Sequence, residues 1–271
     1  MITSAEIKIL GCGNAFNHVC GNTSGLLKVV DESEGEKHIL IDCGYDVPQK
    51  INISTLDAVI ITHTHADHAG GLEELAFRLK YQYPGKRVKL FAREAVCDHI
   101  ERMLFPVLQA AMYCDNDIDE YHLNAPLRHY FDVEGVRDGY ASYHATDLLG
   151  VAEMAMPKVP HSHTLPCASV SLEFQTSDGV KFVWWSGDTC KISPELRNRT
   201  YDFVFHEVQF GHNPTGKNAH VLYEDLVEEA AVTPKHGNWI LTHLPEMLPD
   251  VRLGKNMAAA LPGNVYKIVG Q

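Results

Sequence analysis

The chain has 271 residues, of which 45% are hydrophobic and 21% charged, and its formal net charge is −12 with neutral histidines. This balance is typical of a soluble globular protein, and the length fits one α/β sandwich or barrel, so we expect a single domain over residues 1–271. The acidic surface argues against a large nucleic acid as partner, because that binding depends on clustered Lys and Arg.

Targeting signals and cysteine usage indicate the compartment. The start of the chain lacks a basic segment followed by a long apolar run, and no stretch approaches ~18 apolar residues. We therefore expect neither a signal peptide nor a membrane-spanning helix. The seven cysteines are odd in number, scattered and never spaced C-x-x-C, which is typical of reduced thiols in a cytoplasmic protein.

Apolar periodicity predicts the elements of the first half. Short strands are expected at residues 7–10, 24–30, 38–41, 56–62 and 87–91. Leu72, Leu75, Ala76 and Leu79 repeat at helical spacing, and a second helix is expected over 93–109. Residues 110–156 show no clear pattern and are interpreted as an elaboration of the core. We expect the aromatic residues of this segment either to stack on a nucleotide base or to pack within the protein: Tyr113, Tyr121, Tyr130 and Phe131.

In the second half, strands are expected at residues 168–175, 180–185, 203–205 and 239–242, with a helix carrying Leu222, Leu226 and Ala230. Apolar strands in both halves end in His or Asp, at positions 42, 63, 188, 206 and 243. In layered α/β folds, ligands gather at the carboxyl ends of strands. Two sheets covered by helices, an αββα sandwich, would bring these ends to one edge.

The segment His63-Thr64-His65-Ala66-Asp67-His68 concentrates four potential metal ligands in six residues. Alternate residues of an extended segment point the same way, so His63 and His65 can reach one ion, while Asp67 and His68 can face a second. Imidazole and carboxylate suit Zn²⁺, with Mn²⁺, Fe²⁺ and Co²⁺ as alternatives. A solvated polar loop is the other interpretation, and the buried strand before the segment argues against it.

This H-x-H-x-D-H pattern resembles the signature of the metallo-β-lactamase superfamily. Residues 40–44 (L-I-D-C-G), 186–189 (S-G-D-T) and 241–243 (L-T-H) resemble its other motifs. The resemblance implies an αββα sandwich with a dinuclear site between the sheets. It also implies that His63 and His65 share one zinc with a third-motif histidine, that Asp67, His68 and His243 hold the other, and that Asp188 lies between them.

The third motif offers two histidines, His161 and His163. His163 is followed by T-L-P-C-A-S, which fits the H-x-x-P-x-[ST] pattern better, so we expect His163 to be the ligand and His161 to lie beside it. Two metals would lower the pKa of a shared water, and the resulting hydroxide would attack a phosphoryl or carbonyl centre. Asp67 is a candidate to accept a proton from that water.

Residues 202–208, 218–220 and 241–243 are similar to the I-H-E-A, G-H-S-T and L-T-H segments of tRNase Z-type enzymes. The similarity implies that His220 is the general acid and Glu207 its orienting partner. A histidine at a helix start is the alternative for His220, and His206 and His212 are expected to be outer or surface residues. Only 24 residues separate His163 from Asp188, which leaves no room there for a tRNA-binding arm.

A tRNase Z-like site without that arm resembles smaller cyclic-nucleotide phosphodiesterases, among them the phage anti-Pycsar enzymes, which form homodimers. We therefore expect a zinc phosphodiesterase acting on a small, cyclic nucleotide. An RNA 3′-endonuclease, a thioester, lactone or β-lactam hydrolase, and a binding module without activity remain alternatives.

Overall fold

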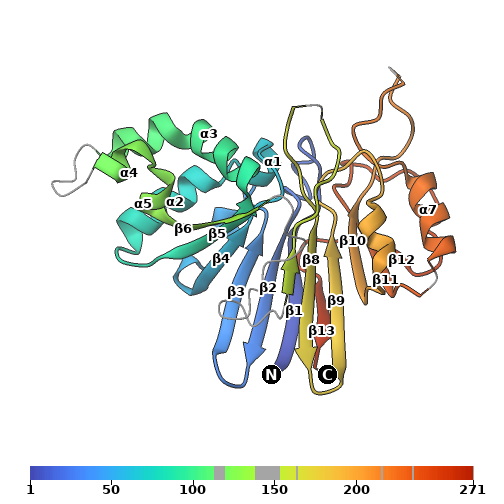
Figure 1. Ribbon diagram of the computed structural model, residues 1–271. Helices are drawn as coiled ribbons and strands as arrows, with labels where there is room; N and C mark the ends of the chain where they lie inside the picture. The colour runs from blue at the N-terminus through green and yellow to red at the C-terminus, as the bar shows by residue number, and fades with distance from the viewer. Residues whose placement is uncertain (113–119, 138–152, 163, 215, 234, 271) are drawn as a thin grey trace.

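The computed structural model describes residues 1–112, 120–137, 153–162, 164–214, 216–233 and 235–270 (Figure 1). The strands of the first half are β1 (Ile2–Gly11), β2 (Ser24–Asp31), β3 (Gly35–Ile41), β4 (Leu56–Ile60), β5 (Val88–Arg93) and β6 (Phe131–Val136). Its helices are α1 (Ala66–Ala69), α2 (Leu72–Gln82), α3 (Glu94–Met112), α4 (Glu120–Asn124) and α5 (Leu127–Tyr130), with 3₁₀ turns at Pro48–Lys50 and Ile53–Thr55.

The second half supplies the remaining strands: β7 (Glu153–Ala155), β8 (Val170–Thr176), β9 (Gly179–Trp185), β10 (Phe203–Glu207), β11 (Asn238–Thr242), β12 (Met257–Ala259) and β13 (Val265–Val269). A 3₁₀ turn at Pro194–Asn198 and helix α7 (Tyr223–Val232) complete this half. Parallel pairing of β9, β10 and β11 points three carboxyl ends in one direction. That is the edge at which the expected His and Asp residues follow their strands.

The strands form one mixed, hydrogen-bonded sheet in the order β12-β11-β10-β9-β8-β1-β2-β3-β4-β5-β6, with β13 beside β1 and β7 beside β8. β1 joins the two halves, since it pairs antiparallel with β2 and meets β8 through Ile2 and Thr176. Helices α2 to α5 cover one outer side and α7 the other (Figure 1). The two halves of this sheet form the two inner layers, and the helices form the two outer ones. This confirms the predicted αββα arrangement.

Two apolar cores hold these layers together. The larger joins the halves and contains the ring systems of Trp184, Trp185, Trp239 and Phe205. The other lies beneath the helices of the first half, where the predicted stripe of Leu72, Leu75, Ala76 and Leu79 is buried against β4 and β5. Burying apolar area on this scale is the main driving force for folding.

The structure also shows what periodicity did not reveal. Strands β6, β7, β12 and β13 were not expected, and three of the four contain at most five residues. Tyr130 and Phe131 are buried core residues. Tyr113 and the side chain of Tyr121 lie outside the described part of the chain. None of the described helices combines the length and the apolar character needed to cross a membrane.

Candidate metal centre

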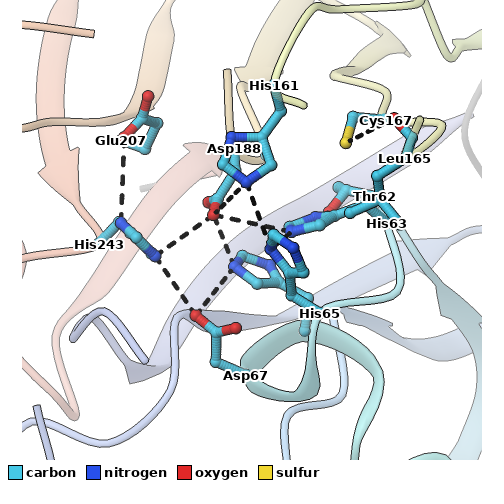
Figure 2. Close-up of polar contacts among 12 residues, drawn as sticks. Thr62, His63, His65, Asp67, His161, Leu165, Cys167, Asp188, Glu207 and His243 are labelled. Atoms are coloured by element: carbon cyan, nitrogen blue, oxygen red, sulfur yellow. Dashed lines mark hydrogen bonds and ion pairs between the residues drawn. The ribbon is translucent and has the colours of Figure 1, made fainter. Parts of the chain in front are cut away.

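The loop after β4 brings its imidazole and carboxylate groups to the carboxyl edge of the sheet (Figure 2). His63 and His65 lie on the extended part, and α1 begins directly after His65, so that Asp67 and His68 fall on its first turn. The loop packs closely on Gly44: a Cβ there would lie 2.3 Å from the Asp67 carbonyl oxygen. Glycine at this position therefore sets how deeply the loop sits.

A first group of donors consists of His63, His65, His161 and Asp188. His65 Nδ1 lies 3.1 Å from His63 Nε2 and 3.3 Å from His161 Nε2. The Asp188 Oδ2 atom lies 3.7 Å from both His63 Nε2 and His161 Nε2. Ligands held 2.0–2.1 Å from one tetrahedral Zn²⁺ lie about 3.4 Å apart, so these separations fit one ion.

A second group consists of Asp67, His68, Asp188 and His243. Asp67 Oδ2 lies 3.5 Å from His68 Nε2 and 3.3 Å from His243 Nε2. Asp188 contributes both oxygens, with Oδ1 3.2 Å from His68 Nε2 and Oδ2 3.4 Å from His243 Nε2. Figure 2 shows the Asp188 carboxylate between the two groups, where it can serve two ions.

Two buried atoms in the centre support a metal rather than a purely hydrogen-bonded cluster. Among the described residues, His68 Nε2 and Asp188 Oδ1 are buried, face each other at 3.2 Å as an ion pair and make no well-aligned hydrogen bond. Buried polar atoms of folded proteins are nearly always satisfied, and a bound cation would satisfy both of these. The donor set, imidazole and carboxylate only, matches the ligand preference of zinc and related divalent ions.

Outer partners fix which ring nitrogen faces the centre. His68 Nδ1 donates to Asp42 Oδ2 at 2.9 Å, and His161 Nδ1 donates to the Ala219 carbonyl at 2.9 Å. The Thr62 hydroxyl donates to Asp42 Oδ1, and the Thr62 hydroxyl oxygen lies 3.1 Å from His63 Nδ1. In each ring Nε2 is left for a metal, as is usual where a second partner orients a histidine ligand.

Three strand ends around the centre have left-handed backbone. Asp42 after β3 and His243 after β11 both have φ of 58°, and Gly187 after β9 has φ of 59°. Non-glycine residues rarely adopt this conformation, and the strain is tolerated where surrounding contacts over-determine it. Here it turns Asp42 and His243 from their strands toward the donor cluster.

In the third motif, His161 is the histidine that lies in the donor cluster. This side chain is buried within the first donor group, whereas the sequence pattern favoured His163 as ligand and put His161 beside it. His163 itself lies outside the described residues. The feature that orients His161 is the Ala219 carbonyl, 58 positions away in the chain. No local motif could have revealed that contact.

A further pair stands beside the second donor group. Glu207 is buried at the end of β10, and its Oε2 lies 3.0 Å from His220 Nδ1. Its Oε1 accepts the backbone N–H of Val221 at 2.8 Å, which fixes the residue directly after His220. His220 Nδ1 is 3.9 Å from Asp188 Oδ2. Leu222 caps α7, so His220 is not the helix cap that was considered for it.

The surroundings set the protonation of these groups. Burial opposes the charged form of His220, but Glu207 and Asp188 outweigh it, and the pKa of His220 is raised. Burial also opposes ionisation of Asp188, yet its neighbours His243 and His68 hold its pKa well below the usual range. Burial lowers the pKa of His63 well below its ordinary value. His220 is thus suited to donate a proton, and His63 to bind metal as neutral imidazole.

Two other histidines near the Glu207–His220 pair make no side-chain contact with it. His206 is buried, donates from Nδ1 to the Glu207 carbonyl at 2.8 Å, and has its pKa lowered by burial to about 4. It therefore supports the backbone of Glu207 as a neutral ring. His212 is exposed on the loop that follows.

The donor groups open into a cavity of about 690 Å³, within the usual range for small-molecule sites. His65, Asp67, Asp188, His220 and His243 line its floor. Its described lining contains no Lys or Arg. Bound cations and the protonated form of His220 are therefore the sources of positive charge that this cavity can offer to an anionic ligand.

Comparison with known proteins places the chain. Residues 5–261 match the family model "Anti-Pycsar protein Apyc1". The Apyc1 protein of Bacillus phage BSP38 is 28% identical over 219 residues, covering 78% of this chain and 79% of the relative. That of Bacillus phage 010DV004 is 32% identical over 215 residues, covering 76% and 77%.

A solved structure agrees in fold. The metallo-β-lactamase fold protein YhfI of Bacillus subtilis superposes with a TM-score of 0.71 at 16% identity, covering 98% of this chain and 99% of YhfI. The fold, the His and Asp clusters and the family match concur. The chain belongs to the Apyc1 family, metal-dependent phosphodiesterases of the metallo-β-lactamase fold that degrade cyclic nucleotides.

Proposed function

We propose that this chain hydrolyses a 3′,5′-cyclic nucleotide at a dinuclear zinc centre, with His220 as the general acid. The observation that carries the proposal is the Glu207–His220 pair, which lies within 3.9 Å of the shared carboxylate of Asp188. A metal centre alone would serve many hydrolytic reactions. A proton donor beside it suits the expulsion of an alkoxide from a phosphodiester.

The proposed ligands are His63, His65 and His161 for one ion, Asp67, His68 and His243 for the other, and Asp188 for both. His163, which the sequence pattern favoured, is the alternative to His161. Two bound ions would neutralise the phosphoryl oxygens and lower the pKa of a water between them. The family match supports metal dependence, and the imidazole-rich donor set favours zinc over Mn²⁺, with Fe²⁺ and Co²⁺ as alternatives.

The chain's own residues then manage the protons. Water adds to phosphorus, one ester P–O bond breaks, and the leaving ribose oxygen takes a proton from His220. Glu207 holds the His220 ring through Nδ1, which leaves Nε2 as the donor. Asp67 is proposed to accept the proton that the attacking water loses, since its carboxylate lies among the ligands of the second ion.

The cavity supports a small substrate over an RNA. A polynucleotide would bring phosphates beyond the reacting one, and these bind chiefly through Lys and Arg. The described lining offers neither residue. We also propose that the chain acts as one domain, because the ligands come from both halves of one sheet. A homodimer is proposed on the resemblance to the phage enzymes, and a cytoplasmic location on the scattered cysteines.

The deciding experiment is a substrate panel on the zinc-loaded protein: 3′,5′-cyclic nucleotides, a precursor tRNA, a thioester and a β-lactam, with zinc per chain measured in parallel. We expect close to two zinc ions and hydrolysis of the cyclic nucleotides. Asp67→Ala, assayed alongside, should abolish the activity and so exclude a contaminating hydrolase. Intact cyclic nucleotides with a metal-loaded protein would refute the proposal, and cleavage of the precursor tRNA alone would replace it with a ribonuclease.

A further inference from the structure

We infer that Phe16 and Phe210 form an aromatic clamp for the base of the nucleotide, in the cavity that opens from the metal centre. The inference rests on the proposed function and adds a subsite to it. Both residues line the same cavity as His65, Asp188 and His220. A substrate whose phosphate is held at the donor groups can direct its base into this space.

Phe16 is presented to solvent by a loop that is itself firmly held. Its side chain is 82% exposed. The buried Asn17 beside it donates from Nδ2 to the carbonyls of Leu244 and Pro245 at 3.0 Å each. An exposed phenylalanine contributes little to folding, and here its backbone is not free to carry it inward. Its ring therefore faces solvent and is available to a ligand in the cavity.

The anchor of this loop is also part of the metal centre. Leu244 and Pro245 directly follow His243, which belongs to the second donor group. The backbone N–H of Asn14 also donates to the Leu244 carbonyl at 3.0 Å. The position of Phe16 is thus tied by short contacts to a proposed metal ligand. A base stacked on it would be fixed relative to the phosphate.

Phe210 is held in the same way, by the segment that follows the proposed general acid His220. The neighbouring Gln209 exchanges backbone hydrogen bonds with Val221 at 2.7 Å and Tyr223 at 3.0 Å, just after His220. The ring of Phe210 is backed by that of Tyr223, with centroids 5.2 Å apart and planes inclined at 31°. Phe16 is thus held by the residues that follow His243, and Phe210 by the residues that follow His220.

The polar groups beside the two rings are engaged within their own loops. Asn14 Oδ1 accepts the backbone N–H of Phe16 at 3.0 Å. Gln209 Nε2 donates to the Gly211 carbonyl at 2.8 Å and contacts Asn218 Oδ1 at 3.2 Å. This leaves the aromatic faces as the main surface for a ligand in this part of the cavity. The base is the planar, unsaturated part of a cyclic nucleotide, and stacking on aromatic side chains is its usual mode of recognition.

The test compares 3′,5′-cyclic AMP with the same ribose 3′,5′-cyclic phosphate lacking a base, followed by ³¹P NMR on the zinc-loaded enzyme. For Phe16→Ala and Phe210→Leu, we expect kcat/KM on cyclic AMP to fall roughly 5- to 150-fold, mainly through KM. On the base-free ring the change should stay within about twofold. Phe210→Leu keeps the apolar contact with Tyr223, so it preserves the fold while removing the stacking face.

Val19→Ala is the matched control, because Val19 is 74% exposed on the loop of Phe16 but does not line the cavity. Equal losses on both substrates, or unchanged kinetics on cyclic AMP, would overturn the clamp. So would a wild-type enzyme that hydrolyses the base-free ring as efficiently as cyclic AMP. A wild-type enzyme inactive on every cyclic nucleotide would instead refute the proposed function, so the two failures are distinguishable.

Discussion

On one side of the centre, four donors come from one six-residue loop after β4; on the other, Asp188, Glu207, His220 and His243 come from four separate segments. The first side is organised locally, by the turn into α1. The second depends on register, since parallel pairing of β10 with β11 sets Glu207 beside Thr242 and hence next to His243. Four of the proposed metal ligands thus depend on local sequence, whereas the remaining ligands and the proton donor depend on how the strands pair. Substitutions should separate proton donation from metal binding.

The largest effect on catalysis without an effect on metal binding is expected from His220→Ala. Removing the general acid should lower kcat on a cyclic nucleotide by about 10²- to 10⁴-fold, because the ribose alkoxide would leave without a proton. With bis(p-nitrophenyl) phosphate the loss should stay below about tenfold, since a nitrophenolate needs no proton. Bound zinc should not change. The comparison is made by steady-state kinetics on both substrates, with metal analysis of each preparation.

His212→Ala is the control for this substitution, since His212 is exposed on the neighbouring loop. It should behave as wild type on both substrates. Equal loss on the two phosphodiesters, or loss of zinc from the His220 variant, would show that the two sides of the centre are not separable in this way.

The same contrast explains what the sequence could reveal. The metal loop was predictable because its four ligands lie within six residues and follow a strand whose apolar residues are all buried. The strand ends carrying Asp188 and His243 were also predictable, from short apolar runs that end in a polar residue. Asp42 was noticed as part of a motif, but its contact with His68 joins residues 26 positions apart and needed the fold.

Other features had no local signal. The H-x-x-P-x-[ST] spacing favours His163, whereas what orients His161 is a carbonyl supplied from the loop before α7. β13 pairs with β1 across almost the whole chain, and only one of its five residues is buried. Five residues, of which only one is fully buried, give too short a hydrophobic pattern for a strand to be predicted. Phe16 likewise gave no pattern, because its position follows from buried Asn17.

A smaller effect is expected on the metal side from Asp42→Asn. The amide can keep the left-handed backbone at this position but no longer presents a charged acceptor to His68 Nδ1. Loss of such an outer partner typically weakens metal binding about 10- to 100-fold. We expect that weakening in a competition titration against a zinc chelator, with kcat near wild type at saturating zinc. The exposed Asp98→Asn is the control, and unchanged zinc affinity in Asp42→Asn would contradict this role.

The smallest effect, a change in pH dependence, should come from Glu207→Gln. Burial opposes the protonated form of His220, and Glu207 is the main group that raises its pKa against burial. Activity that needs protonated His220 is present below that pKa and is lost as pH rises through it. Removing the carboxylate lowers the pKa, so the alkaline limb of kcat/KM for a cyclic nucleotide should move to lower pH, while the limb for bis(p-nitrophenyl) phosphate stays in place. With the exposed Glu228→Gln as control, a shift on both substrates would assign Glu207 to the metal side instead.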